Sequence, residues 1–413
     1  MPKIFFVILL LSLSGCSLQQ HNNNKLANQL RQQPPASILA TLKQTTPDDT
    51  DIAQYDLNVG YLQLITGDFE SAIISLSRAK KEMQLLEAIS VSENVAAGTV
   101  NETFRRYSGY PTDRVMVHNM LALSYLFNND IEGARVEMLQ ADITMKKLAD
   151  GEQLHGQLAE THLLSAIIYE LLDERSNSFI SYQFTEKVLN QRNMPLPEGV
   201  KLGLLRMSYK MGNDAQYTEY SKKFPQLVKL AQSNKQIFGL YFDGVVSNKI
   251  EKSIMVPSYN GEQLIRISMP AYPPLNYRPQ KLDINDGQQI TSSTVVENID
   301  LLAREDLDKE YPSILILTTT RAVSKYKVVE EATKKDAFAG ALLNIATVLS
   351  EVADVRSWNM LPANIQFGYF ETNVNNVTIS TTNKPDSIIN LEGAQQFVFL
   401  ASSLTDTVFH YQQ

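Results

Sequence analysis

The fold of this chain is decided by residues 60–72, which read Gly60-Tyr61-Leu62-Gln63-Leu64-Ile65-Thr66-Gly67-Asp68-Phe69-Glu70-Ser71-Ala72. Gly60 and Ala72 are small enough for two antiparallel helices to cross closely, and Gly67-Asp68 suits the turn between them. Ala79, further along, would let the next helix approach. The stretch therefore predicts a pair of helices that pack through small residues.

The same pattern returns along the chain. A second copy contains Ala122, Tyr125, Asn129-Asp130-Ile131, Ala134, Met138 and Ala141, and a third, looser copy contains Ala166, Tyr169, Asp173, Ser178 and Tyr182. His118 and His162 occupy the same repeat position, 44 residues apart. A weaker fourth copy spans Leu205 to Tyr220, with a turn at Gly212-Asn213-Asp214.

These units resemble tetratricopeptide repeats (TPRs). The resemblance implies an α-helical solenoid over residues 51–225, whose concave face would receive a peptide, a helix or a partner domain. The step from Ala72 to Ala134 is 62 residues, whereas plain arrays repeat every ~34. The excess lies between Val91 and Arg114, and it fits either an insertion on the binding face or an idle surface loop.

Beyond Phe224-Pro225 the chain changes period. Strands are predicted at Ile237–Asp243, Ile250–Val256, Leu264–Met269, Asn364–Phe370, Val374–Ile379 and Gln396–Leu400, and helices at Val295–Asp308, from Pro312 to about Glu331, and at Asp336–Val355. Asn260-Gly261 would close one hairpin, and a turn near Glu371 to Asn373 another. Strands on both sides of a helical block predict a smaller α+β domain over residues 236–413, with a mostly antiparallel sheet. The predicted fold class is thus α+β, solenoid first.

Residues 1–15 are typical of a secretory signal, with Lys3 before an apolar run that is too short to span a bilayer. Leu13-Ser14-Gly15-Cys16 resembles the lipobox of bacterial lipoproteins. That resemblance implies cleavage before Cys16 and lipid on its thiol and new amine; the other interpretation is an ordinary signal with an incidental cysteine. Cys16 is the only cysteine in the chain. In proteobacterial lipoproteins an Asp after the lipidated Cys retains the protein in the inner membrane, so Ser17 implies the outer membrane, with the chain facing the periplasm.

The residues after the lipobox are polar, and residues 16–50 are predicted to be a flexible tether. A short helix from Ser37 to Lys43 is expected within it. The net charge of −8 disfavours nucleic acid as a partner, and after Cys16 no apolar run is long enough for a membrane span. Membrane attachment is therefore expected through lipid alone.

No motif for a nucleophile elbow, a zinc helix, a phosphate loop or a calcium loop occurs in the sequence. His155 and His162 lie two helical turns apart, but His162 already has a structural role as a repeat position. We therefore expect no metal, no cofactor and no catalytic residues.

One further stretch carries a resemblance, Ala353-Asp354-Val355-Arg356-Ser357-Trp358-Asn359-Met360-Leu361-Pro362. It is similar to a signature of a family of uncharacterised proteobacterial TPR lipoproteins, for which the resemblance implies no activity. Asp354, Arg356 and Trp358 are the residues that would form a recognition site. In the alternative interpretation, Trp358 fills the corner between helix and strand, while Arg356 pairs with Asp354 or caps the C-terminus of the helix.

Together the lipobox and repeat resemblances imply a lipid-anchored outer-membrane lipoprotein that faces the periplasm and acts as a protein-binding scaffold or adaptor. By analogy with other periplasmic TPR lipoproteins, its expected role is in cell-envelope assembly. The competing hypothesis is a periplasmic enzyme, with a site between the solenoid and the α+β domain that includes Asp354 and Arg356. A deep pocket with buried carboxylates would favour the enzyme, and an open groove would favour binding.

Overall fold

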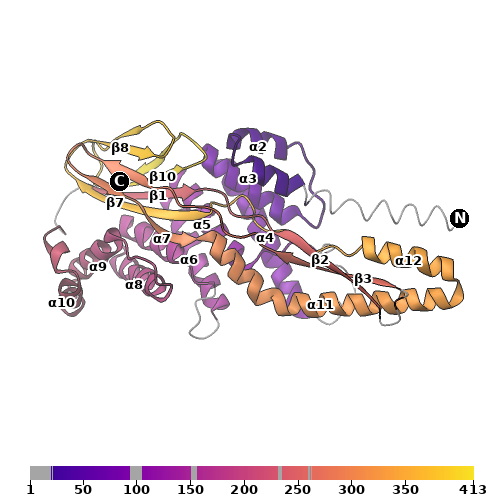
Figure 1. The fold of residues 1–413 in the computed structure, drawn as a ribbon. Helices are drawn as coiled ribbons and strands as arrows, with labels where there is room; N and C mark the ends of the chain where they lie inside the picture. The colour runs from indigo at the N-terminus through magenta and orange to yellow at the C-terminus, as the bar shows by residue number, and fades with distance from the viewer. Residues whose placement is uncertain are drawn as a thin grey trace.

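The computed structural model describes residues 20, 22–93, 105–149, 156–230, 235–258, 261 and 263–413. Within them an N-terminal helical solenoid precedes an α+β region whose strands are mostly antiparallel, which confirms the predicted fold class (Figure 1). Cys16, His155, Asn260 and the middle of the predicted insertion lie outside the described residues.

The described solenoid consists of four consecutive helix pairs. The pairs are α3 (Ile52–Thr66) with α4 (Phe69–Glu93), α5 (Pro111–Phe127) with α6 (Ile131–Leu148), α7 (Ala159–Leu171) with α8 (Arg175–Gln191), and α9 (Glu198–Lys210) with α10 (Asp214–Lys223). Each pair turns at a residue with positive φ, namely Gly67 (85°), Asn129 (61°), Asp173 (54°) and Gly212 (67°). The predicted turns are therefore confirmed, the weak fourth copy included. A Cβ on Gly60 would lie 2.5 Å from Cγ of Leu76, so the first crossing requires glycine.

The prediction of a flexible tether over residues 16–50 is wrong for its described part. Residues 22–29 are helical, and α2 (Pro35–Leu42) follows close to the predicted short helix. Leu26, Leu30 and Ile38 are buried in the main core. Scattered among Asn and Gln, these apolar residues are few, but they recur at helical spacing and share one buried face.

The main sheet combines strands from both ends of the α+β region. Its order is β11 (Phe409–Gln412), β10 (Gln396–Ser402), β1 (Lys235–Asp243), β7 (Asn364–Thr372) and β6 (Thr294–Asn298). Only the pairing of β1 with β10 is parallel. The expectation that strands before and after the helical block close one sheet is confirmed.

A second, four-stranded sheet packs on the first. Its order is β5 (Ile290–Ser292), β4 (Leu282–Asn285), β8 (Asn376–Thr381) and β9 (Ser387–Asn390). The predicted hairpin of Asn364–Phe370 with Val374–Ile379 is wrong, because β7 and β8 belong to different sheets. Both edges of β7 are already paired, with β1 and with β6, so β8 pairs with β4 instead.

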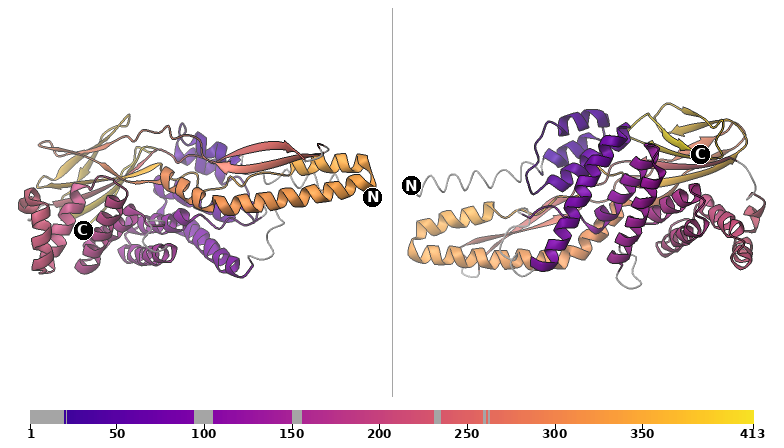
Figure 2. Two further views of the ribbon diagram at one scale, coloured as in Figure 1. Left: turned by 60° about the horizontal axis from the view of Figure 1, so that its bottom comes forward. Right: turned by 180° about the vertical axis from the view of Figure 1, so that it is seen from behind.

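The remaining elements form a projection that we call the arm. It consists of the hairpin of β2 (Ile250–Pro257) and β3 (Leu264–Ala271) together with α11 (Ile299–Lys335) and α12 (Ala337–Leu349). Figures 1 and 2 show the arm extending away from the sheets, with α11 as its long axis.

Several of the predicted helix boundaries in this region are wrong, including the end of the last helix, which was expected at Val355 but lies at Leu349 in α12. Val295 and the three residues after it belong to β6, which accords with their β-branched composition. Proline inside a helix removes a hydrogen bond and usually bends the helix rather than ending it. Pro312 accordingly lies inside α11, which changes direction in its first half (Figure 1).

Solenoid and main sheet share one hydrophobic core. The first helix of each pair is mostly buried, and in α7 every residue is buried. The ring of Tyr61 in α3 lies 6.2 Å from the ring of Phe242 in β1. A Cβ on Gly199 in α9 would lie 2.3 Å from Cβ of Tyr369 in β7. The sheet therefore packs against the solenoid through the first helices.

Candidate functional site

The solenoid face that we expected to receive a partner is occupied by the chain's own α+β region. Asn58 in α3 donates through Nδ2 to Oδ1 of Asn359 at 3.1 Å, and Gln54 donates to the carbonyl of Ser357 at 2.6 Å. At the other end, Nη1 of Arg206 in α9 donates to the hydroxyl of Tyr369 at 3.0 Å. The expectation of an open groove along this face is therefore wrong.

Arg356 ties three distant segments together. Its Nε and Nη2 donate to the carboxylate of Asp354 at 2.7–3.2 Å, and its Nη1 donates to Oδ1 of Asp51 at 3.0 Å. Nη1 also reaches the carbonyls of Thr50 and Arg105 at 2.9 and 2.8 Å. A buried guanidinium with all these partners stabilises the junction of solenoid and sheet, and little of it is available to a ligand.

Trp358 is 2% exposed and belongs to the core shared by solenoid and sheet. An indole in this position cannot touch a partner while the protein is folded. Of the three residues proposed as a recognition site, Arg356 and Trp358 are both 2% exposed, and Asp354 is partly buried and paired with Arg356. The geometry favours the packing interpretation of all three.

The predicted enzyme site between the two regions corresponds to a real cavity of about 360 Å³, lined by residues 105–110, α11 and Asp354 with Arg356. The buried carboxylates of Asp113 and Asp306 do not line it, and both are engaged in hydrogen bonds. Asp113 accepts hydrogen bonds from the hydroxyl of Tyr107 and the backbone N–H of Tyr110, and Asp306 accepts one from the N–H of Thr112. Burial raises the pKa of Asp306 to about 7. These groups act as structural bridges.

Lys249 is a buried cation that the sequence analysis missed. Its Nζ donates to the carbonyl of Arg356 at 2.8 Å and lies 3.6 Å from the ring centroid of Tyr110. Burial lowers its pKa to about 8, although the nearby Asp354 and Asp113 oppose the shift. No sequence motif marks it, since its partners come from other segments.

A second polar junction joins α7 to β6. Glu160 is fully buried and accepts a hydrogen bond from Asn119, while Glu297 accepts one from the N–H of Ala159 at 2.8 Å. Burial raises the pKa of Glu160 to about 8 and that of Glu297 to about 7, and Glu297 adds to the shift of Glu160. One oxygen of Glu160, Oε1, has no hydrogen-bond partner among the described residues.

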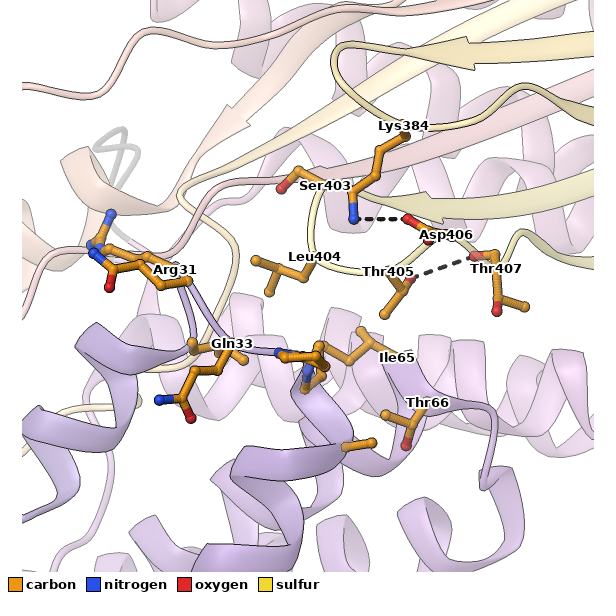
Figure 3. Close-up of a pocket in the computed structure, with 15 residues that line it drawn as sticks. Arg31, Gln33, Ile65, Thr66, Lys384, Ser403, Leu404, Thr405, Asp406 and Thr407 are labelled. Carbon is orange, nitrogen blue, oxygen red and sulfur yellow. Dashed lines mark hydrogen bonds and ion pairs between the residues drawn. The ribbon is translucent and has the colours of Figure 1, made fainter.

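A further cavity of about 550 Å³ lies where the N-terminal helices meet the end of α3 and the loop before β11 (Figure 3). Lys384 and Asp406 form an ion pair at 2.9 Å on its wall, and the hydroxyls of Ser403, Thr405 and Thr407 surround it. The two charged side chains of this ion pair neutralise each other, and the cavity holds no buried group placed for catalysis among the described residues.

The arm carries a row of large apolar side chains that are exposed to solvent. Along α12, Phe338, Leu342, Ile345 and Leu349 are 73, 45, 57 and 62% exposed. Their spacing of four, three and four residues places them on one stripe, which is the spacing of a helix–helix seam. The other side of α12 faces β3, where Asn344 bonds both the N–H and the carbonyl of Leu264 at 3.1 and 2.8 Å.

The apolar run of α12 is visible in the sequence, but its exposure is not. Ile254, Met255 and Ile316, elsewhere on the arm, are also more than half exposed. Contiguous apolar surface of this kind marks interaction sites in soluble proteins. We therefore take the stripe of Phe338, Leu342, Ile345 and Leu349, called the α12 stripe below, as the candidate functional site.

The described residues contain no group of three or more His, Cys, Asp or Glu side chains arranged to hold a metal ion. They also contain no helix that is both long and apolar enough to cross a bilayer. His162 is buried and stacks on Phe184 with ring centroids 5.1 Å apart, consistent with a packing role at its repeat position.

No model of a known protein family matches this chain, and no curated protein matches it. Among solved structures, the apo form of RapI is similar over 48% of this chain and 49% of its own, with 14% identity and a TM-score of 0.35. MamA from AMB-1 is similar over 52% of this chain and 95% of its own, with 13% identity and a TM-score of 0.33. A Rap protein complexed with Competence and Sporulation Factor is similar over 53% of this chain and 55% of its own, with 11% identity and a TM-score of 0.30. The chain spans about half the length of the two Rap structures, and likenesses of this size establish no shared function.

Proposed function

We propose that the protein is a lipid-anchored scaffold at the periplasmic face of the outer membrane, and that it binds a protein of the cell envelope through the α12 stripe. The exposed stripe is the observation that carries the proposal. Four large apolar side chains at seam spacing, on a helix without charged residues, favour burial against an apolar helix face of a partner. No catalytic reaction is assigned to the chain.

The arrangement of the molecule supports this assignment of the binding surface. The first helices of the solenoid are packed against the sheet, which leaves them no role in capture. The arm, in contrast, projects from the body along α11, whose 37 residues would span about 55 Å. A surface at the side of such a projection can reach a partner without disturbing the shared core.

The membrane attachment rests on the lipobox-like sequence at Cys16 and on Ser17 after it. Because one acyl chain binds a bilayer only marginally, several chains on Cys16 would be needed for stable anchoring. Replacing Cys16 by Ala should leave uncleaved precursor in the inner membrane. Normal processing of that variant, with continued fractionation in the outer membrane, would contradict the anchoring.

The binding surface can be tested with two matched substitutions. Ile345 and Ile388 are both exposed isoleucines, at 57 and 75%, but Ile388 lies on β9, away from the α12 stripe. A photo-crosslinking residue at position 345 should capture an envelope protein in living cells, and Ile345→Glu should abolish its co-purification. The same two changes at position 388 should have no such effect. Equal capture from both positions, or unchanged co-purification of Ile345→Glu, would contradict the proposal.

A further inference from the structure

A separate cavity lies on the solenoid, between α4, α5 and α6. It encloses about 490 Å³. Met83, Val117 and Leu148 supply its apolar lining, and Lys80, Arg114 and Lys147 supply positive charge from three different helices. Among the described residues, Glu87 is the one acidic side chain that lines it. The cavity is therefore basic in a chain whose net charge is −8.

The three cations are not equally engaged. Lys80 donates to Glu137 at 2.7 Å and to Gln140 at 3.2 Å. Arg114 donates to the carbonyl of Ser108 at 3.2 Å, and its Nη1 lies 3.5 Å from Glu87, beyond a strong hydrogen bond. Lys147 makes no ion pair with any residue in the described part of the chain. Positive charge is thus left over at the mouth of the cavity.

The floor of the cavity is polar and fixed. His118 is 2% exposed, and its Nδ1 lies 2.7 Å from Oε2 of Glu137. Burial lowers the pKa of His118 despite the carboxylate beside it, so the ring is neutral near pH 7 and its Nδ1–H donates to Glu137. Both oxygens of Glu137 are therefore used, by His118 and by Lys80. The negative charge of Glu137 is compensated by Lys80, so it does not repel an anion in the cavity.

We propose that this cavity binds the carboxylate of an acidic peptide segment, with Lys147 and Arg114 contacting the charge and Met83, Val117 and Leu148 contacting an adjacent apolar side chain. Pockets of this volume hold ligands the size of a few residues. A ligand that was anionic throughout would leave the apolar wall unused, and an uncharged one would leave Lys147 unpaired. The carboxylate could come from a peptide C-terminus or from a Glu or Asp side chain. The proposal does not depend on the α12 stripe.

The test measures binding of fluorescein-labelled peptides to the full-length protein by fluorescence anisotropy. The probe is a short peptide of alternating Leu and Glu with a free C-terminus, compared with its C-terminal amide and with a version in which Gln replaces Glu. Loss of affinity on amidation identifies the terminal carboxylate as the bound group, and loss with Gln identifies the side chains. The sequence offers matched charge reversals in Lys147→Glu and Lys146→Glu. Lys146 is adjacent but pairs with Asp142 at 2.6 Å and does not line the cavity.

Lys147→Glu should weaken binding at least tenfold. Lys146→Glu makes the same change in net charge, but its affinity should stay within twofold of wild type because Lys146 does not line the cavity. Both variants should melt at the wild-type temperature, because both lysines are exposed. Three results would overturn the proposal. They are equal effects of the two reversals, undiminished binding of a Leu/Gln peptide with an amidated C-terminus, which lacks all carboxylates, or no binding by the wild type at millimolar peptide.

Discussion

Trp358 and Arg356 lie two positions apart and act on different partners. The guanidinium crosslinks Asp51 to Asp354 at the junction, and the indole fills space below it. Composition marked these residues as unusual, because the chain has a single Trp, but it left open whether they bind a ligand or the chain itself. The partners of Arg356 lie about 250 and 305 residues away, and local spacing carries no information about such contacts.

The packing role of Trp358 predicts a large loss of stability on truncation. Trp358→Ala should lower the free energy of unfolding by roughly 3–5 kcal/mol, because it empties a fully enclosed site. The native protein should emit at short wavelength, resist quenching by iodide and shift to the red on unfolding. Red native emission that iodide quenches freely, with wild-type stability of the variant, would show that the ring is exposed.

Glu160 predicts a pH dependence with a definite sign. Its folded-state pKa of about 8 lies above the ordinary value of about 4.3, so the folded protein binds the proton more tightly. The stabilisation is complete below about pH 4 and is lost as pH rises through 8. Glu160→Gln keeps the neutral form, so its stability relative to wild type should rise by at least about 1 kcal/mol between pH 6 and 8.

Chemical denaturation at a series of pH values measures this difference. Glu132→Gln is the control, because Glu132 is exposed on α6 and loses the same charge. Parallel pH profiles for wild type and Glu160→Gln would mean that Glu160 is ionised without cost in the folded state.

At the scale of elements, the sequence was informative wherever structure is local. The helix pairs follow from small residues and turn residues within about 20 positions of one another, and β1, β2 and β3 follow from runs of β-branched and aromatic residues. The arm was less predictable, because Pro312 has two local solutions, a helix start or a bend inside a longer helix. Packing of α11 against β3 and α12 selects the second.

The contact between α9 and β7 gives a test in which two effects have opposite signs. Ala is the better helix former, so helix propensity alone predicts that Gly199→Ala stabilises the protein by about 0.5–1 kcal/mol. The new methyl would instead lie 2.3 Å from Cβ of Tyr369, and overpacking of this kind typically costs about 1–3 kcal/mol. We expect a net loss of stability in thermal or denaturant unfolding. A gain would indicate that α9 does not pack on the sheet at this position.

At the scale of the whole molecule, the central feature is that the solenoid binds its own α+β region. A repeat pattern predicts that a face exists and how it is spaced, but not what covers it, since the covering residues lie in another part of the chain. Tyr61 and Tyr182 lie in the first and third repeat copies, and both are buried. The same reasoning could not place Phe242 or Tyr369 against them. The sequence therefore could not show that the α+β region covers this face, or that the arm exposes an apolar stripe.

A double-mutant cycle between Asn58 and Asn359 tests this feature most directly. The two side chains are 301 residues apart in sequence and hydrogen-bond across the junction at 3.1 Å. The free energy of unfolding would be measured for wild type, Asn58→Ala, Asn359→Ala and the double variant. Residues in contact couple by about 0.5–3 kcal/mol, whereas distant residues are additive within about 0.3–0.5 kcal/mol. We predict coupling of about 1 kcal/mol, because either single change leaves the other buried amide without this hydrogen-bond partner. Additivity within error would contradict the packing of the α+β region on the inner face of the solenoid.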